Sequence, residues 1–175
     1  GVEKRFGATV ALDRVSFQVR PGTVHALLGE NGAGKTTLMR VAYGLTSADA
    51  GTLRWRGAAL AVASPRDALA AGIGMVQQHF SLVPALTVAE NVALGGRGLF
   101  ARRAAEERVR ELAASTGLAV DERALAGELP IGAQQRVEIL KALARGVKLL
   151  ILDEPTATLA PADAAALLRW ARAFA

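Results

Sequence analysis

A glycine-rich octet near the start of the chain has the residue types and spacing of a phosphate-binding loop. Residues 29–36 read GENGAGKT and fit the pattern G-x-x-x-x-G-K-[ST]. Glycines lack a Cβ, so the backbone can curl and direct successive N–H groups at one polyanion. Lys35 supplies a point charge for the outer phosphates, and the hydroxyl of Thr36 can ligate Mg²⁺. We expect the following residues to contact a nucleotide: Gly29, Glu30, Asn31, Gly32, Ala33, Gly34, Lys35, Thr36 and Thr37.

The segments on either side of the octet have the patterns of a strand and a helix. Residues 23–28, TVHALL, form a short apolar run that is typical of a buried strand. Residues 37–43 have a helical pattern that ends at Gly44, a natural C-cap. A helix that starts at the loop adds its unpaired N–H groups to the phosphate site. The alternative, a chance glycine-rich turn, does not explain this order of strand, loop and helix.

A second motif places two carboxylates at the end of an apolar strand. Residues 149–154 read LLILDE. An Asp at the carboxyl end of a buried strand beside a phosphate loop can hold Mg²⁺ through water, which is the role we expect for Asp153. Glu154 is placed to orient or deprotonate a water that attacks the terminal phosphorus. The alternative is a pair of solvated acids, and the phosphate loop makes it the weaker explanation.

Composition bounds the class of protein. The 175 residues suit one domain, and 51% of them are hydrophobic, which is enough for a sizeable core. There is no cysteine, so a disulfide framework and a thiolate metal site are excluded. The net charge is +5, but the basic residues are dispersed along the chain. This pattern predicts solvated helix faces with ion pairs such as Glu106–Arg110, and it does not predict a nucleic-acid-binding surface. Residues 68–89 lack charged side chains, but they contain glutamines, glycines and a proline, which would be costly in a membrane span. The segment is therefore predicted to be a buried strand followed by a loop.

Strands that alternate with helices predict an α/β fold with a mainly parallel sheet. Two stretches, 10–19 and 51–57, have the alternation of antiparallel pieces that would sit apart from it. Thr87 and Glu90 have the spacing of a capping box at a helix start. Two more strands are predicted, at residues 73–76 and 148–152. One further helix is expected to start at Pro65, two to cover residues 101–116 and 131–145, and a last one to start at Pro161.

A third motif narrows the family. Residues 129–136, LPIGAQQR, open a helix shortly before the Asp153 strand, and with this segment nearly the whole chain resembles the nucleotide-binding subunit of an ABC transporter. The resemblance implies a P-loop NTPase fold with a parallel sheet core, a small antiparallel part and a helical subdomain. In that family this segment is the signature motif, which binds the ATP of the opposite subunit. It implies this role for Pro130, Ile131, Gly132, Ala133 and Gln134.

The resemblance implies roles for residues outside these motifs. Phe6 matches the aromatic that stacks on adenine, with a core phenylalanine as the alternative. Gln78 matches the glutamine that reaches Mg²⁺ and links the site to the membrane partner, with Gln77 as a close competitor. The implied metal ligands are therefore Thr36, Gln78 and Asp153, and the residues implied to carry the reaction are Glu154, Lys35 and Gln78.

The signature segment departs from the family pattern, which begins Leu-Ser-Gly-Gly-Gln. Here Pro130 replaces Ser, Ile131 replaces Gly and Ala133 replaces Gln. Pro130 removes a hydroxyl and an N–H, but it suits the first turn of a helix, so the donors of Ile131 and Gly132 remain. Residues 157–160, ATLA, stand where the family has a loop that contacts the opposite subunit, and they lack its usual Asp. We expect two unequal ATP sites if the partner domain carries a different signature.

The sequences of residues 72–87 and 134–143 resemble those of ATPase domains from bacterial sugar and nucleoside importers. In such importers two of these domains often share one polypeptide. The chain resembles the first of the two, as a partial domain with a core at 1–77 and 147–175 and a helical subdomain at about 78–146. The family's histidine after the next strand is not in the sequence, so we expect the chain alone to hydrolyse ATP poorly.

The implied partners are a second ATPase domain, in the same or a tandem chain, paired head to tail, a transmembrane permease and, indirectly, a solute-binding protein. The implied location is peripheral, at the cytoplasmic face of the cell membrane. The alternatives are a soluble ABC-type ATPase that acts on ribosomes or DNA, and a phosphate-loop kinase.

Overall fold

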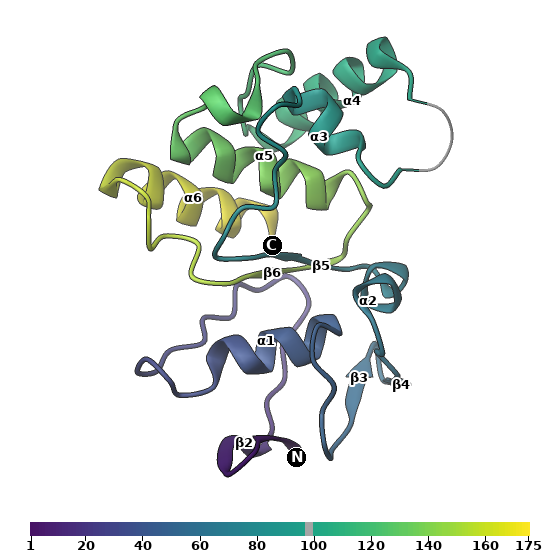
Figure 1. Ribbon diagram of the computed structural model, residues 1–175, viewed down its shortest axis with the longest axis vertical. Helices are drawn as coiled ribbons and strands as arrows, with labels where there is room; N and C mark the ends of the chain where they lie inside the picture. Colours follow the sequence, from purple (N-terminus) through teal and green to yellow (C-terminus); the bar gives the residue numbers. More distant parts are fainter. Residues whose placement is uncertain (97–99) are drawn as a thin grey trace. The chain divides into compact units, whose positions relative to one another are not determined.

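The computed structural model describes residues 1–96 and 100–175, and these divide into two compact units (Figure 1). The first unit comprises Gly1–Gly74 with Ala175, and the second comprises Met75–Phe174. The division into an ATPase core and a helical subdomain at the bounds given above stays a prediction.

The first unit combines two antiparallel strand pairs with two helices. Strands β1 (Val2–Phe6) and β2 (Thr9–Val15) form a hairpin, and β3 (Leu53–Trp55) pairs with β4 (Ala58–Leu60). Helix α1 (Lys35–Tyr43) packs on the first hairpin. The elements share a small core made of Val2, Leu12, Leu38 and Val41. The two antiparallel pieces predicted near the start are therefore confirmed.

Both helices of this unit end at glycines. The amide of Gly44, which has a φ of 78°, donates to the carbonyls of Arg40 and Val41 at the end of α1. Helix α2 (Pro65–Ala71) follows Ser64 and ends at Gly72 in the same left-handed conformation. Only glycine adopts this conformation without steric strain, so the helix end predicted at Gly44 is confirmed, and Gly72 ends α2 for the same reason.

The strand predicted at residues 23–28 is wrong. The structure has no strand there, and the side chains of Val24 and Leu28 are 53% and 88% exposed. Leu27 alone packs partly against the core of the first unit. An apolar run has strand propensity, but a buried strand also needs hydrogen-bonded neighbours, and none of the described residues pairs with this segment.

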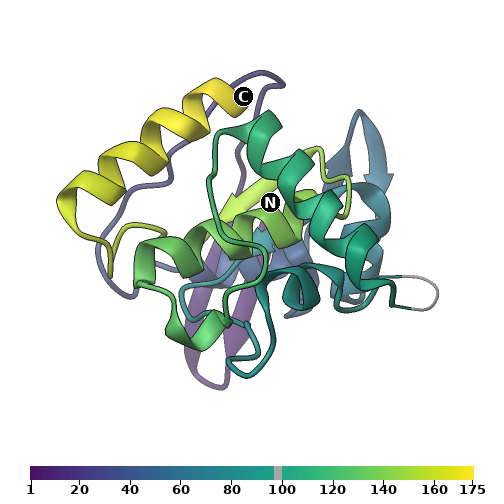
Figure 2. The ribbon, with the colours of Figure 1, turned by 90° about the horizontal axis from the view of Figure 1, so that it is seen from above.

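The second unit consists of one strand pair and a set of helices. Residues Met75 and Val76 of strand β5 (Ile73–Val76) lie beside β6 (Leu149–Leu152) in a parallel pair. Helices α3 (Val88–Ala93), α4 (Arg102–Thr116) and α5 (Ile131–Leu143) pack against one another. The 3₁₀ turn η1 (Ala126–Glu128) precedes α5, and α6 (Pro161–Phe174) follows β6. Figure 2 shows α4, α5 and α6 from a second direction.

The core of this unit lies between the three packed helices. It is built from small and branched apolar side chains, and its most deeply buried members are Val88, Val109, Val137, Ile139 and Leu140. The capping box predicted at the start of α3 is confirmed, because the hydroxyl of Thr87 accepts from the amide of Glu90 and the Glu90 carboxylate accepts from the amide of Thr87. Within the described ranges no helix has the length and apolar character needed to cross a membrane.

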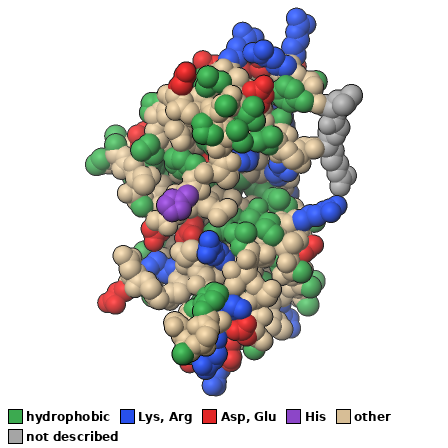
Figure 3. All heavy atoms as spheres, viewed as in Figure 1, with side chains coloured by type: hydrophobic (Ala, Val, Ile, Leu, Met, Phe, Trp, Pro, Cys, Tyr) green, Lys and Arg blue, Asp and Glu red, His purple; other side chains and the backbone are tan. Residues whose placement is uncertain are grey.

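Charged side chains are dispersed over the surface. On the face drawn in Figure 3, Lys and Arg side chains are interspersed with Asp and Glu side chains. The predicted Glu106–Arg110 pair is wrong, since Arg110 pairs with Glu122 at 2.7 Å. Glu106 instead lies between Arg102 and Arg123, each 3.0 Å from one of its carboxylate oxygens, and is 5% exposed. A distant loop therefore supplies the partner that the helix periodicity assigned to Arg110.

The Glu106 pairing predicts a specific loss of stability in acid. The hydrogen bond from Arg123, followed by that from Arg102, holds the pKa of the Glu106 carboxyl below its ordinary value of 4.5. A carboxyl with a lowered pKa in the folded state contributes stability that is present above the unfolded pKa and is lost as the pH falls through the folded value. Glu106→Gln should therefore flatten the acid limb of the free energy of unfolding, measured by urea titration between about pH 7 and pH 3.

Glu107→Gln is the matched control, because Glu107 lies on the same helix and is exposed. It should leave the acid limb unchanged. If both substitutions reduced the pH dependence of the free energy of unfolding equally, the Arg123 contact would not be the cause of the acid loss of stability.

Candidate nucleotide-binding site

The loop at residues 29–36 has the backbone that an anion site requires. Gly32 and Gly34 have φ values of 84° and 86°, which place both in the left-handed region. The amide of Ala33 donates to the carbonyl of Glu30 at 3.2 Å, so the loop is a tight turn that ends where α1 begins. Gly34 is the N-cap of α1 and offers no side chain to cover the first turn. The positive end of the helix is therefore directed toward a ligand in the loop.

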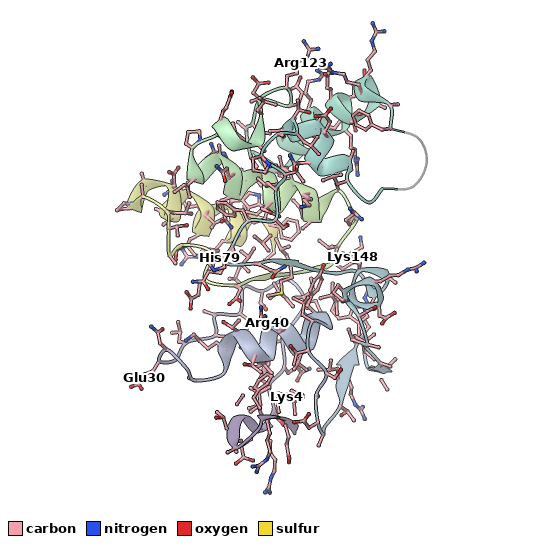
Figure 4. The ribbon with its side chains drawn as sticks, viewed as in Figure 1. Lys4, Glu30, Arg40, His79, Arg123 and Lys148 are labelled. Atoms are coloured by element: carbon pink, nitrogen blue, oxygen red, sulfur yellow. The ribbon has the colours of Figure 1, made fainter. Side chains whose placement is uncertain are left out.

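The ammonium group of Lys35 lies over this loop. Its Nζ donates to the carbonyl oxygens of Gly29 and Glu30, each at 2.8 Å. The cation is thus already at the position from which it can reach phosphates held by the loop amides. The side chain of Glu30 points away from α1 at the tip of the loop (Figure 4).

Strand β2 fixes the base of the loop. A Cβ on Gly34 would lie 2.3 Å from the carbonyl oxygen of Ala11 and 3.1 Å from Cδ2 of Leu12. Such distances are far inside van der Waals contact, so the strand and the loop can approach this closely only because residue 34 is glycine. The hairpin of β1 and β2, which carries Phe6 at the end of β1, is therefore held against the phosphate loop.

Phe6 is not a core residue, which removes that alternative. Its side chain is 53% exposed at the end of β1. The Nζ of Lys4 lies 5.4 Å from the ring centroid and also forms a 2.7 Å ion pair with Asp49. An exposed ring with a cation at 5.4 Å can stack on a flat heterocycle, so adenine stacking by Phe6 stays a prediction with a suitable geometry.

The second unit brings Asp153, Glu154 and Gln78 together. Asp153 is 7% exposed at the end of β6, and its amide donates to the carbonyl of Val76 at 3.0 Å. The Nε2 of Gln78 donates to Oε2 of Glu154 at 3.0 Å. This contact favours Gln78 over Gln77 as the glutamine that acts with the acid pair. The two residues are 76 positions apart in the sequence, and the pairing of their strands makes the contact.

The backbone of Glu154 is strained. Its φ is 46°, a left-handed conformation that costs about 1–2 kcal/mol for a residue with a Cβ. Strain of this kind is often found where a side chain must be held in a working orientation. Here the unusual backbone turns an exposed carboxylate toward Gln78, whereas the neighbouring Asp153 stays buried.

The signature segment forms the start of α5. Pro130 is the N-cap, and its carbonyl accepts from the amides of Ala133 and Gln134 at 2.8 and 3.0 Å. The side chain of Ala133 is buried, and the Gln134 side chain donates to the carbonyl of Leu129 at 2.8 Å. Both side chains therefore stabilise the helix start, and a ligand here would meet backbone groups of Ile131 and Gly132.

One acid near this segment was not found from the sequence. A Cβ on Gly132 would lie 2.8 Å from the carboxylate of Asp163, and Arg136 lies 3.8 Å from the same group. Asp163 belongs to the first turn of α6, and no sequence spacing connects it with α5.

Among the residues described, no three or more His, Cys, Asp or Glu side chains form a group that could hold a metal ion. The donors that fit Mg²⁺ are the Thr36 hydroxyl and the carboxylate of Asp153, both hard oxygen ligands that leave room for water and phosphate oxygens. Their role as ligands stays a prediction.

Comparison with known proteins decides the family. The sequence profile described as ABC transporter matches residues 12–157, which is most of the chain. The chain belongs to the ABC transporter family. The octet at 29–36, the acid pair at 153–154 and the segment at 129–136 all fall within the matched region, so they are parts of one ABC domain.

Individual relatives are ATP-binding proteins of importers. The chain is 46% identical to the glucose import ATP-binding protein TsgD13 of Haloferax volcanii, over 93% of this chain and 36% of the relative. It is also 46% identical to the nucleoside import ATP-binding protein NupA of Lactococcus lactis, over 96% of this chain and 34% of the relative. The chain thus spans about a third of the length of these relatives.

Solved ABC cassettes have the same fold. The chain superposes on the ADP conformation of MJ1267, an ATP-binding cassette of an ABC transporter, with a TM-score of 0.87 and 28% identity, over 99% of this chain and 74% of that chain. It superposes on cbiO1 from Clostridium perfringens with a TM-score of 0.82 and 26% identity, over 99% of this chain and 70% of that chain. The predicted P-loop NTPase fold is confirmed.

The close approach of β2 predicts that Gly34→Ala is more damaging than Gly32→Ala. Both positions have the same left-handed backbone, which costs an alanine about 1–2 kcal/mol. At Gly32 nothing lies within 4 Å of an added Cβ, whereas at Gly34 it would lie 2.3 Å from a backbone carbonyl. We expect Gly34→Ala to lower the free energy of unfolding by at least about 2 kcal/mol more than Gly32→Ala, measured by denaturant titration.

Equal losses from the two substitutions would show that β2 does not press on the loop. The comparison is internal, because both variants add the same methyl group to the same loop and differ only in what that group meets.

Proposed function

We propose that this chain is the ATP-binding and ATP-hydrolysing part of a subunit that powers the import of a small solute, a sugar or a nucleoside, through a membrane permease. The observation that carries the proposal is the Lys35 ammonium over a left-handed glycine loop, within a chain that aligns over more than nine-tenths of its length with import ATP-binding proteins. An ATPase domain does not contact the solute, so the solute class comes from the relatives alone.

The chemistry is an in-line attack of water on the γ-phosphorus. The loop amides and Lys35 bind the phosphates and stabilise the charge that develops in the transition state. Mg²⁺, held by Thr36, Asp153 and Gln78, would neutralise phosphate charge when bound. Glu154 accepts a proton from the attacking water or orients it, and the hydrogen bond from Gln78 fixes the Glu154 carboxylate.

The proposed assembly is a head-to-tail pair of ATPase domains. The start of α5, at Pro130–Gln134, would meet the ATP held by the partner domain. ATP would draw the domains together, and hydrolysis would let them part and move the permease. A subunit of this kind lies at the cytoplasmic face of the membrane as a peripheral protein, and a solute-binding protein reaches the permease from the other side. Because each site needs both domains, this chain by itself would hydrolyse ATP slowly.

The two rival functions have less support. A kinase has an acceptor pocket or lid in place of the signature segment, and residues 129–136 form the start of α5 instead. A soluble ABC-type ATPase of ribosomes or DNA fits less well with relatives that are import proteins. The purified assembly separates these possibilities, since only the importer requires a permease for ATP-driven uptake.

Replacement of Lys35 tests the proposal directly. In the full-length subunit with its permease, Lys35→Met should abolish ATP turnover and weaken nucleotide binding at least about tenfold, because a charge-assisted contact to phosphate is lost. Binding is measured with a fluorescent ATP analogue, and turnover by phosphate release. Lys148→Met is the control, because Lys148 is exposed and lies far along the chain from the loop.

Unchanged affinity and turnover after Lys35→Met would refute the proposed function. The corresponding lysine of the partner domain extends the test, since unequal losses from the two substitutions are expected if the two signatures differ.

Glu154→Gln should separate binding from hydrolysis. The amide keeps an oxygen that can accept from Gln78, but it cannot take a proton, so turnover should fall at least about 100-fold while ATP binding persists. The full-length subunit should then remain dimeric with ATP trapped, as measured by size-exclusion chromatography with light scattering. The exposed Glu128→Gln is the control, and wild-type turnover by Glu154→Gln would remove Glu154 from the reaction.

A further inference from the structure

The four residues that carry Gln78 are held at both ends. On one side the carbonyl of Val76 accepts from the amide of Asp153 at 3.0 Å, so β5 is fixed to the strand of the acid pair. On the other side Ser81 is bound by side chains of α5. Residues 77–80 run between these two fixed points, and Gln78 contacts Glu154 from the middle of the run. A shift of either fixed point therefore acts on the Gln78–Glu154 contact.

The contact at Ser81 uses all of its polar groups. The carboxylate of Glu138 accepts from the Ser81 amide and, at 3.0 Å, from its hydroxyl. The Nζ of Lys141 donates to the carbonyl of Ser81 at 3.1 Å and approaches its hydroxyl oxygen at 3.0 Å. We call these three residues the Ser81 cluster. The contacts that Ser81 makes are not local, because Ser81 lies 57 and 60 positions before its two partners.

The Ser81 cluster contains a buried carboxylate that is paired with an ammonium group. Glu138 is 6% exposed, and a buried carboxylate is costly unless it is paired and hydrogen-bonded. Lys141 lies three positions later on the same helix face, with Nζ 3.9 Å from Oε2 of Glu138. Apolar side chains at these two positions would leave the amide, hydroxyl and carbonyl of Ser81 without these partners, so the charged groups fix the position of Ser81 specifically.

The segment after Ser81 is fixed to the helices as well. Asn91 of α3 is fully buried, accepts from the amide of Val83 at 2.7 Å and donates to the carbonyls of Val83 and Leu86. The chain from Ser81 to Leu86 is therefore bound to α5 at one end and to α3 at the other. Only residues 77–80 are left to absorb a displacement between these helices and β5.

Helix α5 joins the Ser81 cluster to the signature segment. Glu138 lies seven residues after Ile131, which is two helical turns or about 10 Å along the axis. A short helix without a kink moves as one body, so a tilt of its first turn displaces Glu138 and Lys141 together. The first turn is the part that, under the proposed function, meets the nucleotide of the partner domain.

We propose that Ser81, Glu138 and Lys141 are positioning residues that set the Gln78–Glu154 contact according to the orientation of α5. The cluster thereby links the ATP bound at the signature of this domain to the water-orienting carboxylate that serves the other ATP of the dimer. This inference rests on the proposed function. It adds that the two ATP sites communicate within a single domain, through the run of residues 77–80.

A double-mutant cycle in the full-length assembly with its permease tests the link. Glu138→Gln keeps the shape of the side chain and removes its charge. It should lower kcat roughly tenfold, through misplacement of Gln78, and leave the KM for ATP unchanged. In a Gln78→Ala background the same substitution should change kcat by less than about twofold, since the cluster then has nothing to position. Ser81→Ala should behave like Glu138→Gln, and Ser81→Thr should restore activity because it keeps the hydroxyl.

Amide hydrogen exchange provides a second measurement that does not depend on residual turnover. In the wild type, ATP should change the exchange of residues 77–80 as well as that of the loop at 29–36. In Glu138→Gln the change at 29–36 should persist and the change at 77–80 should be lost. Glu122→Gln, which removes the charge of an ion pair outside the cluster, should leave both changes intact and is the matched control.

The outcomes separate the inference from the proposed function. If Glu138→Gln lowers kcat equally in both backgrounds, or leaves kcat and the exchange of 77–80 unaltered, the cluster has no positioning role. The proposed function survives either result as long as Lys35→Met abolishes turnover in the same assembly. If Lys35→Met leaves turnover intact, the proposed function fails, and this inference fails with it.

Discussion

The phosphate loop depends on one close approach, between the backbone of Gly34 and the carbonyl of Ala11. A loop that binds a polyanion through its amides must turn its N–H groups inward, and this requires left-handed residues directly before a helix. Such a loop has few side chains with which to pack. Strand β2 supplies the missing support from below, and a Cβ at residue 34 would remove it. This contact holds the start of α1 against the hairpin that carries Phe6.

The second unit carries two adjacent carboxylates, and the structure gives them different surroundings. Asp153 is buried and continues the strand pairing through its amide, whereas Glu154 turns outward with a left-handed backbone. The backbone change after Asp153 gives one acid a protected position and the other a hydrogen bond from Gln78.

Local features of the sequence predicted local structure well. The capping box of Thr87 and Glu90, the proline at the start of α2 and the glycine at the end of α1 depend on neighbours within one turn, and all are present. The glycine loop and the acid pair were recognisable for the same reason. Features that depend on distant partners were not predicted. Residues 23–28 have the composition of a strand but no neighbour to pair with among the described residues.

The same distinction explains the candidate site. Helix periodicity assigned Glu106 to Arg110, but a loop brings Arg123 to it. Asp163 and the Ser81 cluster come from segments separated by roughly thirty to sixty positions, and no motif spacing connects them. Residue types alone would have shown a Glu and a Lys three positions apart on α5, which is an ordinary surface pair until Ser81 is placed beside it.

The hydrogen bonds of Lys35 have a consequence for selectivity. Its ammonium is already bound to two carbonyl oxygens of its own loop, so an incoming anion does not meet a bare cation. Two of its three N–H donors are occupied, so an anion that binds the whole ammonium group must displace both of these bonds. A small monoanion offers little beyond what it displaces, whereas a triphosphate satisfies the ammonium and several amides at once. The resting loop thus sets a threshold of charge and size, and ubiquitous small ions gain little by entering it.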